Sequence, residues 1–279
     1  MKKKTFAQIG IGRDKPTFII AEAGINHNGD LKTAFRLVDA AKKAGASAIK
    51  FQTYITEKRV PKGSPIYSIL KQCELTWEDT RKLKQYADKK GIMFFSTPFD
   101  QESVAFLAAL GVPLLKVASF DIVNLSLLRA MIKTKIPMII SRGMASAAEV
   151  DTAARMCKKG GVEFALLHCV SAYPAPKKAV NLRAITTLAE RFDVPVGFSD
   201  HTLDIDACVY AVVRGATVLE KHFTLDRKMK GPDHQLSADP KMLATLVSRV
   251  REAEDMLGSG TLVSLPAEAD IRQYRRVST

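Results

Sequence analysis

The sequence of 279 residues predicts one (β/α)8 TIM barrel, in which eight parallel strands are each followed by a helical segment. Three observations lead to this prediction. Eight short apolar runs read as buried strands, and amphipathic helical patterns fill the gaps between them. From the third run onward the strand starts are roughly 20 to 30 residues apart, the length of one βα unit. Each run also ends on a polar or ionisable residue, as expected where strand ends share a site.

The predicted strands are short and rich in β-branched and aromatic residues. They cover residues 18–24, 48–54, 93–98, 114–119, 137–143, 164–170, 195–201 and 218–224. Because successive βα units cross over with the same right hand, eight of them close naturally into a barrel. The main alternative is an open doubly wound sheet. That fold usually carries a glycine-rich phosphate turn, G-x-G-x-x-G, after its first strand, and this chain has none.

The predicted helices follow the strands in order and begin at residues that favour helix N-termini. They cover residues 31–45, 77–91, 100–111, 125–135, 146–161, 181–192, 204–216 and 239–258. The expected N-terminal residues are Asp30, Asp100, Ser146, Asn181, Asp204 and Asp239, and Gly91 is an expected C-terminal stop.

The remaining segments have separate roles. Residues 1–16 are expected to form a short hairpin that plugs the N-terminal mouth of the barrel. Residues 55–75 are a long connection and therefore a candidate active-site loop. Residues 261–279 are expected to be a tail or linker. The whole chain, residues 1–279, is thus interpreted as one barrel domain.

Composition excludes several other classes of protein. The net charge of +13 raises the question of an anionic partner, but the chain has neither a nucleic-acid-binding motif nor clustered basic and aromatic residues. A positive field can still attract a small phosphorylated or carboxylated substrate. The four cysteines show no framework spacing, and no apolar run is long enough for a membrane span. We therefore expect a cytoplasmic protein with reduced thiols and no nucleic-acid or membrane partner.

The strand ends gather ionisable residues on one predicted face. They include Glu22, Lys50, Thr97, Lys116, Ser141, His168, Asp200, His201, Glu220 and His222. All five histidines map to this face. Since His201 and His222 end adjacent strands, they are expected side by side, with Asp200 and Glu220 nearby. Imidazole and carboxylate ligands with open positions predict a catalytic divalent ion such as Mn²⁺, Mg²⁺ or Zn²⁺.

Two lysines and several hydroxyls predict binding of an anion with several oxygens. Lys50 and Lys116 end the second and fourth strands, and the hydroxyls belong to Thr97, Ser119, Ser141, Ser171 and Ser199. A compact ammonium group binds phosphate or carboxylate as a point charge. The alternative is that each lysine forms a structural ion pair with Glu22 or Asp121.

Several motifs of the chain resemble the sialic acid synthase family, which includes N-acetylneuraminate, legionaminic acid and pseudaminic acid synthases and spore-coat polysaccharide synthases. The motifs are EAGINHNG at 22–29, SDHT at 199–202, EKHFT at 220–224 and GPDH at 231–234. The resemblance runs from about residue 16 to 260. It implies a barrel that condenses phosphoenolpyruvate with an N-acetylated hexosamine, typically N-acetylmannosamine, and releases phosphate.

The resemblance also implies roles for individual residues. His201 and His222 match the ligands of a divalent metal, usually Mn²⁺ or Mg²⁺. Positions lining the phosphoenolpyruvate site are matched by Lys50, Thr97, Lys116, Ser119, Ser141, Ser171 and Ser199. Positions near the sugar are matched by Glu22, Asp121, Tyr173 and Asp233. Glu22, Lys50, Lys116 and Asp121 are the expected catalytic residues, and Glu22 is the candidate for proton transfer.

The chain departs from the family pattern in ways that concern the sugar more than the reaction. Asp121 stands where glutamate is common, Arg142 lies in SRG where STG is usual, and Ser171 replaces an asparagine of some members. Bacterial members usually continue into an antifreeze-like domain, which in a domain-swapped dimer reaches the partner's site. This chain ends about where that domain would begin. Either the sequence is part of a longer protein, or the natural protein is a barrel alone with altered substrate use or little activity. The resemblance also suggests a homodimer.

Two other functions stay open at this point. One is a related synthase that makes a 3-deoxy-ketoaldonic acid phosphate, which needs a basic site for the phosphate of the aldehyde; Arg142 is the only hint of such a site. The other is a catalytically silent barrel that binds a sugar or a partner protein. The complete set of Glu22, Lys50, Lys116, His201 and His222 argues against loss of activity.

Overall fold

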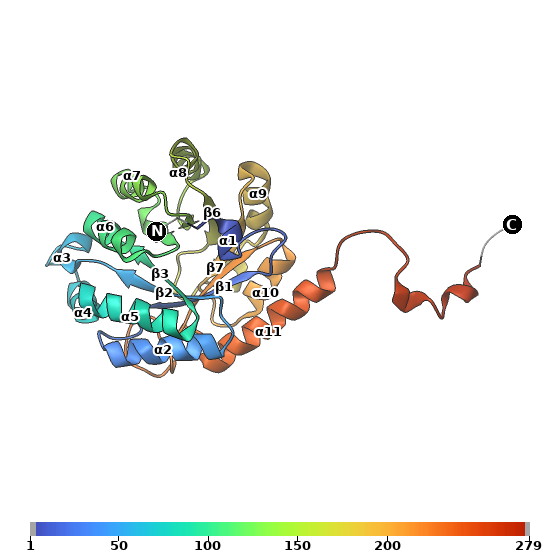
Figure 1. Cartoon of the computed structure of the whole chain (residues 1–279), viewed down its shortest axis with the longest axis horizontal. Coiled ribbons are helices and arrows are strands. Elements are labelled where there is room, and N and C mark those ends of the chain that lie inside the picture. Colours follow the sequence, from blue (N-terminus) through green and yellow to red (C-terminus); the bar gives the residue numbers. More distant parts are fainter. Residues whose placement is uncertain (1–3, 277–279) are drawn as a thin grey trace.

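The computed structural model describes residues 4–276 and confirms the predicted barrel (Figure 1). Its eight parallel strands pair in sequence order, and the first strand pairs with the last, so the sheet is closed. The strands are β1 (Phe18–Gly24), β2 (Ala48–Thr53), β3 (Met93–Pro98), β4 (Leu115–Val117), β5 (Met138–Ser141), β6 (Phe164–Cys169), β7 (Val196–Asp200) and β8 (Val218–His222). All eight predicted strands are therefore confirmed, with ends that differ by a few residues.

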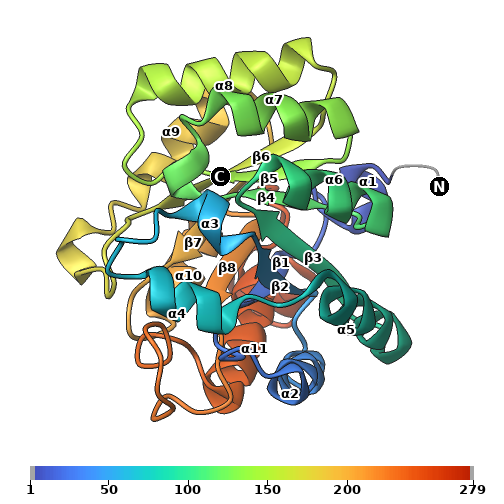
Figure 2. The same cartoon turned by 90° about the vertical axis from the view of Figure 1, so that its left-hand side faces the viewer.

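A ring of helices surrounds the barrel (Figure 1). The barrel helices are α2 (Leu31–Lys43), α5 (Trp77–Lys90), α6 (Gln101–Leu110), α7 (Leu125–Thr134), α8 (Ala147–Lys159), α9 (Arg183–Phe192), α10 (Asp206–Val213) and α11 (Pro240–Leu257). The smaller helices are α1 (Phe6–Ile9), α3 (Thr56–Arg59) and α4 (Tyr67–Cys73), with short 3-10 turns at Ser119–Asp121, Lys177–Ala179, Pro266–Glu268 and Arg272–Tyr274. The predicted loop 55–75 thus contains α3 and α4, which lie next to each other (Figure 2).

Strand alternation sorts the side chains into two sets. One set faces the helices and joins a large apolar core. The other set faces the barrel axis, where Phe18, Ile20, Phe95, Ile139 and other apolar residues fill the lower half. The next inward positions of the same strands carry polar residues, such as Glu22 two positions after Ile20. The apolar core therefore fills the N-terminal half of the barrel interior, and polar side chains fill it toward the C-terminal ends of the strands.

The N-terminal segment plugs the barrel, but the predicted hairpin is wrong. Residues 6–9 form the one-turn helix α1, because the Oγ1 of Thr5 accepts the backbone N–H of Gln8 while the Oε1 of Gln8 accepts that of Thr5. Such a reciprocal pair favours a helical turn. Phe6 and Ile9 then pack into the apolar cluster at the lower end of the axis. Residues 1–3 of the predicted plug lie outside the described part of the chain.

Most of the predicted helix starts are confirmed. The side chains of Asp30, Asp100, Ser146 and Asp239 each accept a backbone N–H of the first helical turn, and Gly91 ends α5 in the left-handed conformation. Asn181 is wrong as a cap. It has a φ of 49°, and α9 begins two residues later without a side-chain cap. Asp204 lies one residue before the N-terminal cap of α10 and accepts the N–H of Asp206.

The chain is exposed from residue 255, in the last turn of α11, to residue 276, and the segment after α11 extends away from the barrel in Figure 1. Residues 277–279 of the predicted tail lie outside the described part of the chain. Over residues 4–276, no helix combines the length and apolar character needed to cross a membrane. The four cysteines are buried and free, as predicted.

Candidate active site

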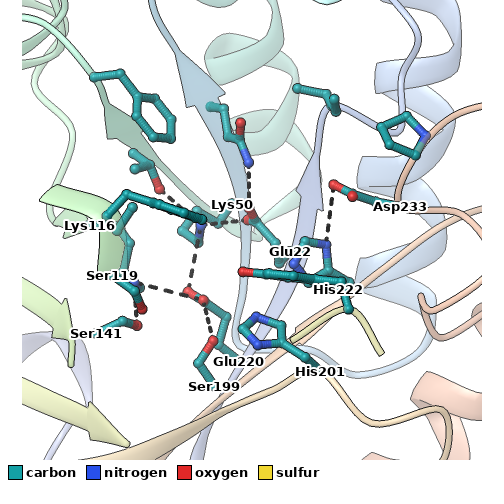
Figure 3. A pocket seen from close by; sticks show the side chains of 18 of the residues that line it. Glu22, Lys50, Lys116, Ser119, Ser141, Ser199, His201, Glu220, His222 and Asp233 are labelled. Atoms are coloured by element: carbon teal, nitrogen blue, oxygen red, sulfur yellow. Dashed lines mark hydrogen bonds and ion pairs between the residues drawn. The ribbon is translucent and has the colours of Figure 1, made fainter. Parts of the chain in front are cut away.

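A cavity of about 260 Å³ opens at the C-terminal ends of the strands, where enzymes of this fold carry their active sites. Its lining includes eleven of the thirteen predicted site residues: Glu22, Lys50, Thr97, Lys116, Ser119, Ser141, Tyr173, Ser199, His201, His222 and Asp233. Figure 3 labels ten of the residues that line the cavity, nine of these eleven together with Glu220. The fold thus brings these residues together, and their roles stay predictions.

Two buried lysines and two buried glutamates form a network at the bottom of the cavity (Figure 3). The Nζ of Lys50 lies 2.7 Å from the Oε2 of Glu22 and 3.6 Å from that of Glu220. The Nζ of Lys116 lies 3.9 Å from the Oε1 of Glu220 and donates to the Oγ of Ser141 at 2.6 Å. The structure therefore supports both interpretations of these lysines, since they form ion pairs and also line the cavity.

Hydroxyl groups complete this network. Lys50 donates to the Oγ1 of Thr97 at 3.0 Å, and Ser199 donates to the Oε1 of Glu220 at 2.9 Å. Ser119 lies 3.0 Å from the Sγ of Cys169, and that sulfur also accepts the backbone N–H of Gly143. The bottom of the cavity thus presents ammonium groups and hydroxyls together, a combination that binds oxyanions.

Burial and the charges of the lysines together give the two glutamates different pKa values. Burial raises the pKa of Glu22, despite the opposing charge of Lys50. For Glu220, burial acts in the same direction, but the charges of Lys116 and Lys50 outweigh it and lower the pKa. Burial also lowers the pKa of Lys116. Because their environments differ, Glu220 is the carboxylate that stays ionised and Glu22 is the one better suited to carry a proton.

The two predicted metal ligands lie side by side above this network. The ring centroids of His201 and His222 are 5.5 Å apart, and the ring of Tyr173 packs 4.3 Å from that of His201. The Nδ1 of His201 lies 2.7 Å from the carbonyl oxygen of Val170 and must donate to it, because a carbonyl only accepts. The Nε2 of His201 therefore keeps a free lone pair. Burial lowers the pKa of His201 to about 4, so this ring is neutral near pH 7.

His222 also has a ring nitrogen without a partner. Its Nδ1 is buried without a hydrogen-bond partner, and the nearest carboxylate oxygen, the Oδ2 of Asp233, lies 3.7 Å away. Within residues 4–276, however, no three His, Cys, Asp or Glu side chains are close enough together to hold a metal ion. The described residues thus bring two imidazoles together here, without a third His, Cys, Asp or Glu side chain close enough to complete a metal site.

The prediction that Asp200 lies beside the histidines is wrong. Asp200 precedes His201 on the strand and so faces the opposite side, where it forms a fully buried ion pair of 2.6 Å with Lys221. His168 faces outward for the same reason, and its Nε2 bonds to the carbonyl of Val180. His27 and His234 are buried near the loops and do not line the cavity. Only two of the five histidines therefore belong to the site.

Two other predicted site residues also lie off the cavity lining. Asp121 is on the turn after β4, where its Oδ1 accepts a weak 3.4 Å bond from Asn124. Ser171 stands behind Gly143, where an added Cβ would lie only 2.4 Å from its Oγ. Arg142, the residue named as a hint of a phosphate site, follows the inward Ser141 and does not line the cavity either.

Glu220, which was expected beside His201 and His222, does line the cavity. Several other lining residues were not predicted. Gln52 lies two positions after Lys50 on β2, so alternation alone places it on the inner face, and its signal was present in the sequence. Arg59 ends the one-turn helix α3 in the long connection after β2, and Phe99 directly follows β3. No periodic pattern marks a loop side chain, and only the folded structure places these two at the cavity.

The fold and this site together define a barrel enzyme, and comparison with known proteins identifies its family. Residues 37–262 match the model of the NeuB family. The chain is 44% identical over 286 residues to the N,N'-diacetyllegionaminic acid synthase of Legionella pneumophila, covering 96% of this chain and 80% of that protein. It is 39% identical to the human N-acetylneuraminate-9-phosphate synthase, covering 92% of this chain and 76% of that protein. The chain belongs to the NeuB family and is a synthase enzyme.

A solved structure agrees with this assignment. The N-acetylneuraminic acid synthetase of Leptospira borgpetersenii, determined in complex with citrate, superposes with a TM-score of 0.93 at 42% identity. The match covers 98% of this chain and 96% of that one. The resemblance inferred from the sequence motifs is therefore confirmed for both family and fold.

Proposed function

We propose that this synthase condenses phosphoenolpyruvate with an N-acylated hexosamine of the N-acetylmannosamine type, forms a nonulosonic acid and releases phosphate. The observation that carries the proposal is the division of one cavity into two parts. Buried lysines and hydroxyls lie at the bottom, and two imidazoles with an aspartate lie above them. The names of the relatives support the same class of reaction.

The bottom of the cavity is proposed to bind phosphoenolpyruvate. Its phosphate and carboxylate would take the ammonium groups of Lys50 and Lys116 as counter-ions and the hydroxyls of Ser119, Ser141 and Thr97 as donors. Positioning dominates such a step, because a fixed enol beside the aldehyde replaces a bimolecular encounter. Each lysine already has a carboxylate neighbour, so the pocket is held ready before substrate arrives.

The upper part is proposed to hold the open-chain sugar. C3 of phosphoenolpyruvate forms a bond to the aldehyde carbon, and the aldehyde oxygen takes a proton for which Glu22 is the candidate donor. Water then adds at C2, the bond between C2 and the phosphate oxygen breaks, and phosphate leaves as C2 becomes a ketone. Tyr173 and Asp233 line the upper part and are proposed sugar contacts, as is Asp121 from just outside the lining.

His201 and His222 are proposed to hold a divalent metal, Mn²⁺ or Mg²⁺. The residues fit, since His201 is neutral with a free Nε2 and the Nδ1 of His222 has no hydrogen-bond partner. Such an ion would polarise the aldehyde oxygen as a Lewis acid. The homodimer and the cytoplasmic location stay predictions.

Phosphate release from phosphoenolpyruvate tests this function. The assay contains Mn²⁺ and compares N-acetylmannosamine and a 2,4-diacetamido hexose with no sugar, each with and without EDTA. We expect release that depends on the sugar and stops with EDTA. Release without sugar, or no release with any acylated hexosamine, would count against the proposal.

Neither alternative gains support from the structure. The 3-deoxy-ketoaldonic acid phosphate synthase needed a basic group for a phosphorylated aldehyde, and Arg142 lies outside the cavity lining. A silent binding barrel would not need buried lysines, carboxylates and imidazoles to converge in one cavity. Arabinose 5-phosphate in the same assay tests the first alternative directly.

A further inference from the structure

We propose that Arg59 selects the acceptor, and that the preferred acceptor is a hexose with a second acylamino group, remote from the aldehyde, which this arginine binds. The inference rests on the proposed function and deepens it. It names the substrate class within the acylated hexosamines and assigns a specificity role to a residue that no sequence motif indicates.

Packing fixes the guanidinium of Arg59 at the cavity. Arg59 is the last residue of α3, and its Cζ lies 3.6 Å from the ring centroid of Phe99 and 4.6 Å from that of Tyr54. Its Nη1 donates to the Oε1 of Gln52 at 2.9 Å. A stacked guanidinium held by one hydrogen bond is ordered, and it has further N–H groups beyond the one that Gln52 accepts.

Arg59 differs from the other cations of the cavity because it has no carboxylate within ion-pair distance in the described part of the chain. Lys50 is paired with Glu22, and Lys116 has Glu220 at 3.9 Å. Arg59 is half-buried, and burial lowers its pKa. A partly desolvated guanidinium with unused donors is a strong site for an oxygen acceptor of a ligand.

The surface beside Arg59 is apolar. Ile66, Ile69 and Leu70 of the α4 region line the same cavity, and the first two are 47% and 40% exposed although they are large aliphatic residues. We call these three side chains the apolar shelf, and a hydrogen bond fixes the segment that carries them. Glu74 accepts the backbone N–H of Thr56 at 3.0 Å, which ties the end of α4 to the start of α3. The shelf therefore offers a preformed contact for a methyl group.

Two hydrogen bonds in series separate Arg59, and the apolar shelf beside it, from the carboxylate proposed to act at the reacting carbon. Gln52 accepts from Arg59 and donates to the Oε1 of Glu22 at 3.4 Å, so Arg59 lies two hydrogen bonds from the proposed proton donor. A substituent next to the aldehyde would stay near Glu22 and His222. A substituent farther along the sugar would reach Arg59.

A guanidinium edge beside aliphatic side chains matches an acylamino group, whose carbonyl accepts a hydrogen bond and whose methyl is apolar. A phosphate matches less well. Its charge would lie against Ile66 and Ile69, and Asp233 and Glu22 line the same small cavity. A 2,4-diacetamido hexose carries one acylamino group near the aldehyde and one beyond it. The structure thus favours this class over N-acetylmannosamine and its 6-phosphate.

The test compares three acceptors, N-acetylmannosamine, its 6-phosphate and a 2,4-diacetamido hexose, in the phosphate-release assay. We expect the highest kcat/KM for the diacetamido sugar. Replacement of Arg59 by Met (Arg59→Met) should raise the KM for the diacetamido sugar about 10- to 100-fold, because a charged donor to its carbonyl is lost. The preference of the enzyme for this sugar over N-acetylmannosamine should fall by a similar factor. Arg59→Lys should recover part of the preference.

Matched controls separate binding from folding. Lys58→Met removes a neighbouring exposed cation of α3 that pairs with Glu102, and it should leave the preference unchanged. The thermal midpoint of Arg59→Met should stay close to that of the wild type. The inference is overturned if the wild type does not prefer the diacetamido sugar, if the 6-phosphate is preferred, or if Arg59→Met affects all acceptors equally. No release with any acceptor would instead refute the proposed function.

Discussion

We expect the buried carboxylate of Glu220 to contribute strongly to the free energy of unfolding, because it is the counter-ion of a buried lysine of the active site. It is the only carboxylate within 4.0 Å of the Nζ of Lys116 among the described residues, and it also lies 3.6 Å from that of Lys50. Glu220→Gln keeps the shape of the side chain and an oxygen that can accept from Ser199. It removes the charge, so Lys116 is left buried without a counter-ion.

The size of the effect follows from the burial of Lys116. Its side chain is 3% exposed, and removing one partner of a buried pair costs about 3 to 5 kcal/mol. We expect Glu220→Gln to lower the free energy of unfolding by about 3 kcal/mol at pH 7. Burial already lowers the pKa of Lys116, and losing Glu220 lowers it further. Because the unfolded chain then binds more protons than the folded one, stability rises with pH, and the loss should be smaller at pH 9.

Urea denaturation of the two proteins at pH 7 and pH 9 measures this difference. Glu102→Gln is the matched control, because it removes a carboxylate from an exposed pair with Lys58 and should cost less than about 1 kcal/mol. A Glu220→Gln variant as stable as the wild type at both pH values would refute the reasoning. A loss that grows toward pH 9 would refute the assignment of the effect to Lys116.

Four further outcomes are expected. His222→Ala should abolish metal-dependent phosphate release while circular dichroism shows an intact fold; undiminished activity would remove the metal assignment. Lys116→Ala should raise the KM for phosphoenolpyruvate at least about 10-fold more than the KM for the sugar, since it removes a charged donor, and equal changes would contradict its role. Gly197→Ala should prevent folding, because the new Cβ would lie 2.1 Å from the carbonyl oxygen of Val218, and soluble protein with a wild-type thermal midpoint would contradict this. Burial lowers the pKa of His27 to about 4, so the folded protein resists protonation of this ring more than the unfolded chain does. The contribution of His27 to the free energy of unfolding should therefore fall by about 2 kcal/mol between pH 7 and pH 5. In urea titrations His27→Gln should lose less stability over this pH range than the wild type.

Much of the fold and the strand residues of the site could be predicted from the sequence, because strand periodicity is a strong signal. Alternation of period two decides which residues face the axis, so Glu22, Lys50, Lys116 and His222 could be placed together from the sequence. The same rule keeps Glu220 on the inner face, as expected, and places Asp200 on the outer face. Asp200 was placed wrongly because a polar residue at the end of a strand can belong to either face, and its position next to His201 in the sequence puts it on the opposite one.

The remaining differences involve segments without periodicity. The N-terminal hairpin was wrong because Thr5 and Gln8 form a local capping pair that outweighs the extended appearance of the segment. Arg59 could not be placed because its position depends on stacking with Phe99, a residue forty positions away on another connection. Such contacts between loops are set by tertiary packing and leave no trace in local sequence.

The most direct test of the central claim is to identify the product formed from phosphoenolpyruvate labelled with ¹³C at C3. The enzyme is incubated with this substrate, an acylated hexosamine and Mn²⁺, and the product is examined by NMR and mass spectrometry. We predict a single acid in which the labelled carbon is bonded to the former aldehyde carbon, with one phosphate released per product. Labelled pyruvate and phosphate without a new carbon–carbon bond would contradict the account.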